Sequence, residues 1–199
     1  MNAKGLGILG LAWALIAASG AYAQSPRQTR MIVPFAAGGV VDIVARGFAQ
    51  EMSAPGAPPV IVDNRVGANG NIGMEACAKS TPDGSTLCVV TGVILSLNPF
   101  AYASMPFDAE KDFVPVIHLG TLNITVAVHP SVPANNMREL IELSKAKPGT
   151  VTWSSLGPGS TAHLYMEWLH ARAGAAFNHI PYKGQPPMVL AAVSGEVNV

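Results

Sequence analysis

The chain has 199 residues, with 12 basic and 12 acidic side chains and therefore a formal net charge of +0. A neutral surface of this kind offers no basic patch for a nucleic-acid backbone and no polybasic stretch for a lipid surface. Nucleic acid is thus excluded as an expected partner, and the 20 glycines and 16 prolines predict a globular protein with many short connections.

An export signal is predicted at the N-terminus. Lys4 precedes an almost wholly apolar run from Leu6 to Ala18, and Ala21-Tyr22-Ala23 fits the small-x-small rule for signal peptidase. The apolar run is shorter than the ~20 residues that span a bilayer, which favours cleavage over anchoring. We therefore expect residues 1–23 to be a signal peptide, no direct membrane insertion, and a periplasmic mature chain that begins at Gln24.

Strand and helix patterns alternate along the mature chain. In chain order we predict a strand at 30–34, a helix at 41–52, a strand at 59–63, a helix at 71–79, a strand at 86–91, a long connection at 98–112, strands at 114–119 and 123–129, a helix from 135/136 to 147, a strand at 151–154, a helix at 161–173, a strand at 177–180 and a helix at 187–193. Val44, Phe48 and Met52 are expected to share the apolar face of the first helix. The alternation predicts an α/β fold with a mostly parallel sheet and helices on both faces.

Two local signals refine this pattern. Asn136 with Glu139 three residues later resembles a capping box at a helix start. The long connection contains Pro99 and Pro106 and is typical of a boundary between two small domains. We place the first domain at residues 24–120 and the second at 121–199.

The cysteines and histidines do not form a metal-binding pattern. Cys77 lies in an apolar helical segment and Cys88 in an apolar strand, so two buried free thiols are favoured, although export would also permit a disulfide between them. The five histidines lack the spacing that would converge on one metal. We predict no metal and no cofactor.

Two glycine turns, at Gly38-Gly39 and at Gly157 to Ser160, each lie between a predicted strand and a predicted helix. The unpaired N–H groups of a helix's first turn hold a carboxylate or phosphate without a cationic side chain. In an open α/β sheet such turns lie at the carboxyl ends of the strands, where ligands bind. Two facing turns would clamp one small anion; the alternative is that both are plain tight connections.

Several side chains near these turns are ambiguous. Asp42 and Arg46, four residues apart, are consistent with a solvated ion pair on a helix. Ser160 is consistent with a simple N-cap, and His163 could either donate to a ligand or face solvent.

Enzymatic alternatives are weaker. The run Gly67 to Gly73 follows a strand but lacks the G-x-G spacing of a dinucleotide site. Ser155 and Ser160 lie outside a G-x-S-x-G elbow, so a secreted α/β hydrolase using Ser160 and His163 is kept only as the alternative function.

Taken together, the motifs resemble the Bug family, the extracytoplasmic substrate-binding proteins of tripartite tricarboxylate transporters. The resemblance covers nearly the whole mature chain and rests on Pro34-Phe35, Gly38-Gly39, Asp42, Arg46, Asn64-Arg65, Gly67 to Gly73, Pro82-Asp83-Gly84, Asn98-Pro99, Asp112 to Val116, Lys147-Pro148-Gly149, Ser155 to Ser160, His163 and Pro181 to Gly184. Each motif is weak alone, but their order and spacing are specific.

The resemblance implies a two-domain periplasmic-binding-protein fold of Venus-flytrap type that closes over a small organic acid and delivers it to integral-membrane transporter subunits. A monomer and no enzymatic activity are expected. Carried over by position, the ligand-binding residues are Phe35, Gly38, Gly39, Val40, Val41, Asp42, Gly67, Ala68, Asn69, Ser155, Gly157, Ser160, Thr161, His163, Pro181 and Tyr182.

Two departures from the family stand out. Family members carry a hydroxyl residue or glycine where this chain has Val40 and Val41, so a side-chain donor to the carboxylate is missing there. Family members also continue well past Val199, which makes the fold incomplete at its C-terminus by comparison. We therefore expect a fragment that is marginally stable and prone to aggregate.

Overall fold

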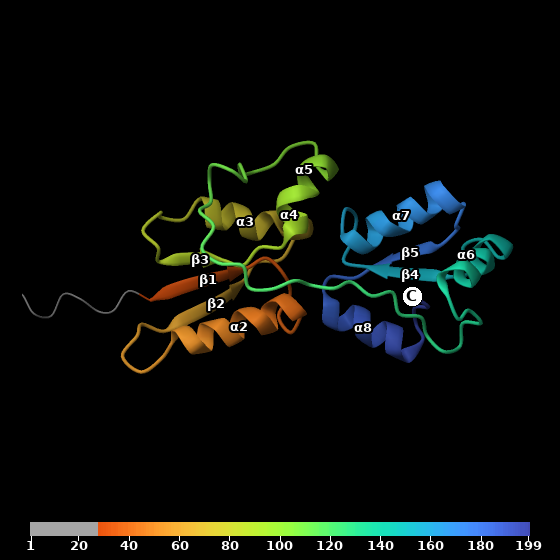
Figure 1. Cartoon of the computed structure of the whole chain (residues 1–199), viewed down its shortest axis with the longest axis horizontal. Coiled ribbons are helices and arrows are strands. Elements are labelled where there is room, and N and C mark those ends of the chain that lie inside the picture. Colours follow the sequence, from red (N-terminus) through yellow and green to blue (C-terminus); the bar gives the residue numbers. More distant parts are fainter. Residues whose placement is uncertain (1–27) are drawn as a thin grey trace, which may run out of the picture.

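The computed structural model describes residues 28–199 as two lobes, each built around its own parallel sheet (Figure 1). The predicted signal peptide lies outside the described residues. The first lobe contains β1 (Thr29–Val33), α2 (Val40–Met52), β2 (Val60–Asn64), η2 (Ala68–Gly70), α3 (Asn71–Ala78), β3 (Thr86–Cys88), α4 (Gly92–Ser96) and α5 (Asn98–Ala101). The second contains α6 (Met137–Ala146), β4 (Thr152–Ser155), α7 (Thr161–Ala173), β5 (Asn178–Pro181) and α8 (Gln185–Ser194).

The sheet of the first lobe has the strand order β2-β1-β3, with both pairings parallel. Met31, Ile32 and Val33 of the central strand are buried, because α2 covers one face of the sheet and α3 the other (Figure 1). The next two strands of the chain, β2 and β3, lie on opposite sides of β1. In open α/β sheets, ligands bind at the carboxyl end of the strands where the strand order reverses in this way. The predicted α/β architecture is confirmed.

The buried face of α2 differs from the prediction. Val41, Ala45 and Ala49 pack on the sheet, whereas Phe48 and Met52 are exposed. Both sets of residues have helical spacing, so periodicity alone favoured the larger side chains. The small alanines allow the helix backbone to lie close to β1, which decides the orientation.

A disulfide joins Cys77 in α3 to Cys88 in β3, with the two Cα atoms 6.3 Å apart. The prediction of two free thiols was therefore wrong. The two segments are apolar as expected, but the turn between them folds β3 back beside α3 and brings the two side chains together.

The second lobe has β4 and β5 in parallel, with α7 and α8 on opposite faces (Figure 1). Trp153 of β4 is buried against Phe177, Met166 and Leu169. The last residue extends this sheet, because the Ser154 N–H donates to the Val199 carbonyl at 2.7 Å.

The predicted capping box at the start of α6 is confirmed. The Asn136 side chain accepts from the Glu139 N–H at 3.0 Å, and the Glu139 carboxylate accepts from the Asn135 N–H at 2.8 Å. The Asn136 side chain thereby satisfies one donor of the helix's first turn, and Glu139 reaches back to the residue before the N-cap.

The strands predicted at 114–119 and 123–129 are wrong. These residues form an extended connection between the lobes (Figure 1), in which Val114 and Val116 are exposed. Their β-rich composition matches a strand, but within the described chain they do not join either sheet. The predicted domain boundary at residue 120 falls in this connection and stays a prediction.

The region before the connection contains two short helices, α4 and α5, where the sequence predicted the end of a strand and a loop. Thr91, expected in the strand, is the N-cap of α4. Within residues 28–199, no helix has both the length and the apolar character needed to cross a membrane.

Candidate functional site

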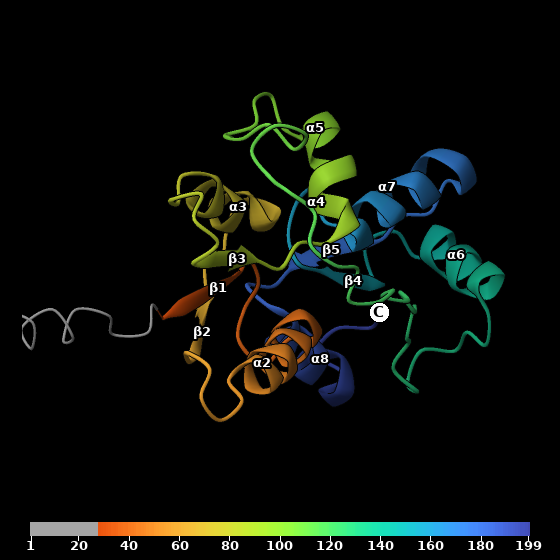
Figure 2. The same cartoon turned by 60° about the vertical axis from the view of Figure 1, so that its left-hand side comes forward.

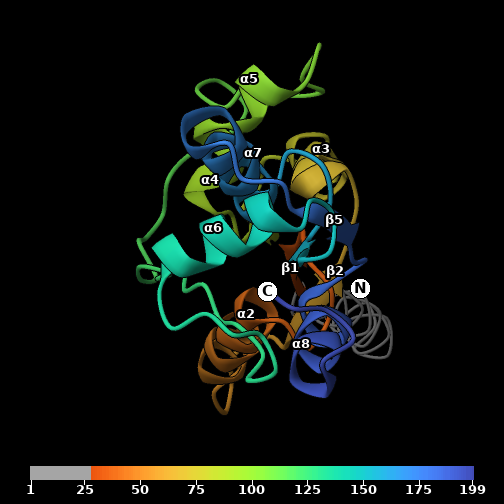
Figure 3. The same cartoon turned by 90° about the vertical axis from the view of Figure 1, so that its right-hand side faces the viewer.

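The predicted site residues lie on four loops at the carboxyl ends of strands. They are placed by the β1–α2 turn (Phe35, Gly38, Gly39, Val40, Val41, Asp42), by the turn after β2 (Gly67, Ala68, Asn69), by the β4–α7 turn (Ser155, Gly157, Ser160, Thr161, His163) and by the end of β5 (Pro181, Tyr182). The helices α2, α7 and α8 all begin here, so their N-terminal N–H groups face the region between the lobes. In Figure 1, α2 and α8 follow one another along the long axis of the molecule, and each begins near the point where the lobes meet; Figures 2 and 3 show the same helices from two other sides.

Two hydrogen bonds tie these loops together across the lobes. The Val40 N–H donates to Oε1 of Gln185 at 2.9 Å, which joins the first turn of α2 to the first residue of α8. The Asn69 amide donates to the Gly159 carbonyl at 3.2 Å, which joins the turn after β2 to the β4–α7 turn. Each of the two glycine turns singled out in the sequence is therefore hydrogen-bonded to a segment of the opposite lobe.

The β1–α2 turn is held by a buried carboxylate. Gly38 has φ +77°, a conformation that favours glycine, and its N–H donates to Oδ2 of Asp42 at 2.8 Å. The same oxygen accepts from Arg46 at 2.9 Å, and Oδ1 accepts from Asn64 at 2.8 Å. The pair of Asp42 and Arg46 exists as expected, but Asp42 is buried rather than solvated.

The environment of this carboxylate fixes its charge. Burial by itself would raise the pKa of Asp42. The three hydrogen bonds and the charge of Arg46 outweigh burial and lower the pKa to about 2. Asp42 is thus ionised at neutral pH, and its carboxylate stabilises the β1–α2 turn.

The N–H groups of Val41 and Asp42 lie in the first turn of α2. They precede the first intrahelical bond, which the Ile43 N–H makes to the Gly39 carbonyl.

The turn after β2 has an unusual backbone. Gly67, Ala68 and Asn69 all have positive φ, at 137°, 46° and 49°. The Asn69 amide also donates to Asn98 at 2.8 Å, and the fully buried Asn98 donates to Asn71 at 2.7 Å. These amides fix the turn beside the β4–α7 loop. In the sequence Asn98 belongs to the Asn98-Pro99 motif, and no local signal indicated its role in this turn.

The β4–α7 turn is organised by two serines. The Gly157 N–H donates to the Ser155 hydroxyl at 2.9 Å, and the Ser160 hydroxyl donates back to the Gly157 carbonyl at 2.6 Å. Ser160 occupies the N-cap position of α7, yet its side chain does not cap the helix. The N–H groups of the first three residues of α7, Thr161 to His163, are therefore left for another acceptor, because the first intrahelical bond is that of the Leu164 N–H to Ser160.

Two histidines lie under this turn. His179 on β5 shares a hydrogen bond of 2.6 Å with the Ser155 hydroxyl, and its ring centre lies 4.6 Å from that of His163. Burial and the neighbouring His163 lower the pKa of His179, and the Glu167 carboxylate opposes this effect. His163 accepts weakly from the Gly159 N–H at 3.4 Å. Sequence reasoning missed His179, because its partner lies 24 residues away on another strand.

This geometry does not support the hydrolase alternative. The Ser160 hydroxyl points to a carbonyl of its own turn, and the His163 ring faces the Gly159 N–H. Ser155 does pair with His179, but Ser155 is fully buried. A nucleophile must reach its substrate while bonded to its base, and neither serine meets both conditions.

The end of β5 completes the region. The Tyr182 N–H donates to the Ser155 carbonyl at 2.8 Å, which places Tyr182 beside the β4–α7 turn. Its hydroxyl is buried without a hydrogen-bond partner of standard geometry among the described residues. Burial and the nearby Glu196 carboxylate raise the pKa of this phenol.

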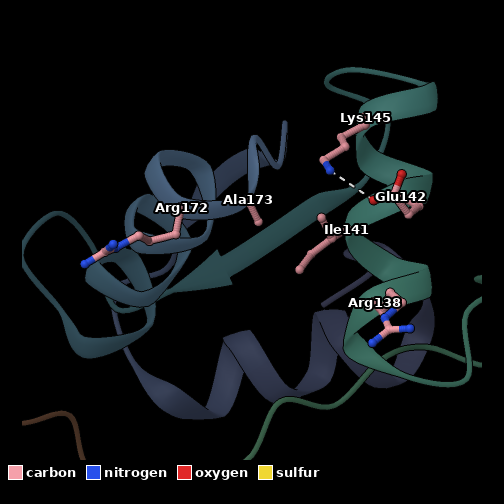
Figure 4. Close-up of a pocket in the computed structure, with 6 residues that line it drawn as sticks. All are labelled: Arg138, Ile141, Glu142, Lys145, Arg172 and Ala173. Atoms are coloured by element: carbon pink, nitrogen blue, oxygen red, sulfur yellow. Dashed lines mark hydrogen bonds and ion pairs between the residues drawn. The ribbon is translucent and has the colours of Figure 1, made fainter.

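A separate surface hollow of about 490 Å³ lies on the second lobe. Figure 4 shows its lining residues: Arg138, Ile141, Glu142, Lys145, Arg172 and Ala173. Lys145 is paired with Glu142 at 2.9 Å, and the two arginines point in different directions, so the cations do not converge on one point (Figure 4). Among the described residues, no cluster of three or more metal-ligating side chains is found here or elsewhere.

Comparison with known proteins identifies the family. Residues 44–199 match the family described as the tripartite tricarboxylate transporter family receptor. Protein BugT of Bordetella pertussis is 40% identical over 176 residues, which cover 86% of this chain and 53% of BugT.

Two solved structures share the fold. One is R. palustris Rpa4515 with adipate, with a TM-score of 0.73, 31% identity, and coverage of 88% of this chain and 59% of that protein. The other is MatC from Rhodopseudomonas palustris with bound malate, with a TM-score of 0.74, 26% identity, and coverage of 87% and 60%.

The chain spans between 53% and 60% of the length of these three relatives. The family consists of receptors rather than enzymes, so the hydrolase alternative is set aside. The match over most of the chain, together with the two lobes, leads to one assignment: the chain belongs to the receptor family of tripartite tricarboxylate transporters, which includes the Bug proteins, and its α/β lobes match a part of their periplasmic-binding-protein fold.

Proposed function

We propose that this chain forms the ligand-binding part of a periplasmic receptor that holds a small carboxylate between its two lobes and passes it to a tripartite tricarboxylate transporter. The observation that carries the proposal is the convergence of the N-termini of α2, α7 and α8 on the region where the lobes meet. The relatives with adipate and malate support a dicarboxylate as the ligand class.

The chemistry of the site favours an anion. The first-turn N–H groups of α2 and α7, which include those of Val41 and Thr161, have no intrahelical acceptor. Such groups, with the positive ends of the helix dipoles, hold a carboxylate without a cationic side chain. The ionised Asp42 is already neutralised by Arg46 and by its hydrogen bonds, which limits its repulsion of a ligand.

Calorimetric titration of the purified chain with malate and adipate tests this function. We expect heat of binding and a raised melting temperature with both diacids. Dimethyl adipate is the matched control, because it keeps the carbon chain but lacks the charges. Equal responses to the diacid and the ester, or no binding of either diacid, would contradict the proposal.

Thr161→Pro tests the role of backbone donors. Proline at the first position of a helix removes one N–H without disturbing the helix, and Ser160 already has the extended conformation that precedes proline. Loss of one hydrogen bond to a charged group predicts roughly tenfold weaker binding of malate. The control is Thr161→Ala, which keeps the N–H and removes the hydroxyl that both variants lack. Equal losses in Thr161→Ala and Thr161→Pro would instead assign the role to the hydroxyl.

A further inference from the structure

Gln185 connects the two lobes at the start of α2. Its Oε1 atom accepts from the Val40 N–H at 2.9 Å, across 145 residues of sequence. Because a backbone N–H can only donate, the side-chain atom facing Val40 must be the carbonyl oxygen. The amide nitrogen of Gln185 therefore points elsewhere, and among the described residues it makes no hydrogen bond.

Gln185 lies where the start of α8 contacts the β1–α2 turn. A Cβ placed on Gly39 would lie 3.4 Å from Oε1 of Gln185, and one placed on Gly38 would lie 3.5 Å from Pro186. On the other side, a Cβ on Gly184 would lie 2.7 Å from the Cβ of Ala36. The start of α8 thus packs directly on the β1–α2 turn, and the hydrogen bond to the Val40 N–H holds the half-buried Gln185 side chain there.

This arrangement brings the Gln185 amide to the proposed anion site at the start of α2. The N–H groups of Val41 and Asp42 follow Val40 in the same turn of α2 and precede its first intrahelical bond, so a carboxylate bound to them would lie near the Gln185 side chain. Val40 and Val41 have no polar side chain of their own. Gln185 reaches this point from the opposite lobe, with its oxygen held by the backbone.

We propose that Gln185 is a specificity-determining residue whose amide nitrogen donates to the ligand carboxylate, in place of the hydroxyl that positions 40 and 41 lack. This inference rests on the proposed function and adds to it a side-chain donor from α8. It also makes ligand binding depend on the closed arrangement, because the donor belongs to one lobe and the Val40 N–H that orients it belongs to the other.

Gln185→Ala and Gln185→Glu test the proposal with malate and adipate as probes. Alanine removes the donor and should weaken binding roughly tenfold. Glutamate keeps an oxygen for the Val40 N–H but replaces the amide donor by a negatively charged oxygen. This charge repels the ligand carboxylate, so Gln185→Glu should weaken binding more than Gln185→Ala does. If Gln185→Glu bound as well as wild type, the side chain would act only as a contact between the lobes. Tighter binding by Gln185→Ala would show that the Gln185 oxygen competes with the ligand for the Val40 N–H. Either result overturns the proposal.

Val40→Pro provides an independent test. It removes the N–H that orients Gln185, and Gly39 has the extended backbone that precedes proline at a helix start. We expect weaker binding in Val40→Pro, and Gln185→Ala in that background should add less than it does in wild type. Full additivity would mean that Val40 does not orient the donor.

Two readouts separate the possible failures. Circular dichroism and thermal melting of each variant check that the fold is kept. Absence of diacid binding by the wild-type chain would contradict the proposed function, whereas wild-type binding that is unchanged in Gln185→Ala and Gln185→Glu would contradict only this inference.

Discussion

A buried carboxylate holds the first glycine turn in its folded shape. Asp42 is 2% exposed and accepts hydrogen bonds from the Gly38 N–H, Arg46 and Asn64. Its pKa of about 2 lies below the usual 3.8, so its charged form stabilises the fold at neutral pH. At 1.36 kcal/mol per pKa unit, this contribution is about 2 kcal/mol.

Asp42→Asn should remove that contribution. A group with a lowered folded pKa stabilises the protein above its unfolded pKa, and the effect is lost as the pH falls from about 4 to about 2. We expect the variant to lose about 2 kcal/mol of unfolding free energy at pH 7 and to show a weaker acid dependence below pH 4. Urea denaturation at several pH values measures both effects.

Glu110→Gln is the control for the loss of one negative charge, because Glu110 is exposed. It should leave the free energy of unfolding nearly unchanged. An Asp42→Asn variant with the acid dependence of wild type would show that Asp42 is not the group that titrates.

At the level of elements, the disulfide fastens α3 to β3 in the first lobe. Cys77 and Cys88 are separated by 11 residues, and the closed loop contains the turn around Gly84. A loop of this length restricts the unfolded chain and is expected to stabilise the fold by roughly 2–3 kcal/mol. The bond is also consistent with export to an oxidising compartment.

The double variant Cys77→Ser with Cys88→Ser tests this contribution. It should lower the melting temperature by several degrees under non-reducing conditions, and wild type with a reductant should behave similarly. Alkylation of the unfolded, unreduced wild-type protein should leave both cysteines unmodified. Modification of both under those conditions would restore the interpretation as free thiols.

Elements with complete local signals were predicted well. The helix at 161–173 was predicted with its observed bounds, because Ser160 and Gly174 mark its two ends. The capping box of α6 was likewise visible as Asn136 and Glu139. These signals act within a few residues, so they can be recognised in the sequence.

Elements that depend on a distant partner were predicted poorly. Residues 114–129 have the composition of strands but pair with neither sheet in the described chain. The buried face of α2 was misassigned because the alanines that meet β1 carry a weaker hydrophobic signal than Phe48 and Met52. A strand requires a neighbour and a helix face requires a surface, and neither is specified locally.

At the level of the whole molecule, the lobes meet through close backbone contacts. A Cβ on Gly184 would lie 2.7 Å from the Cβ of Ala36 in the other lobe. Gly184 has φ 172°, an extended conformation open to any residue, so a substitution there acts only on the contact between the lobes. Closure of the two lobes therefore requires glycine at this position.

Gly184→Ala should hold the lobes apart. We expect a larger radius of gyration by small-angle X-ray scattering and weaker binding of malate, because the donors of α2 and α8 no longer meet. Gly47→Ala is the matched control, since a Cβ at this exposed helical position meets no atom within 4 Å. Identical scattering and affinity for wild type and Gly184→Ala would show that the contact does not govern closure.

By itself, the sequence determined the α/β class, the positions of both glycine turns and the family, because these depend on local patterns and on the order of short motifs. The tertiary structure decided which side chains meet at the turns. Gln185 reaches Val40 across 145 residues and His179 reaches Ser155 across 24. Such pairings arise from the packing of one lobe against the other and of one strand beside another, and no local pattern encodes them.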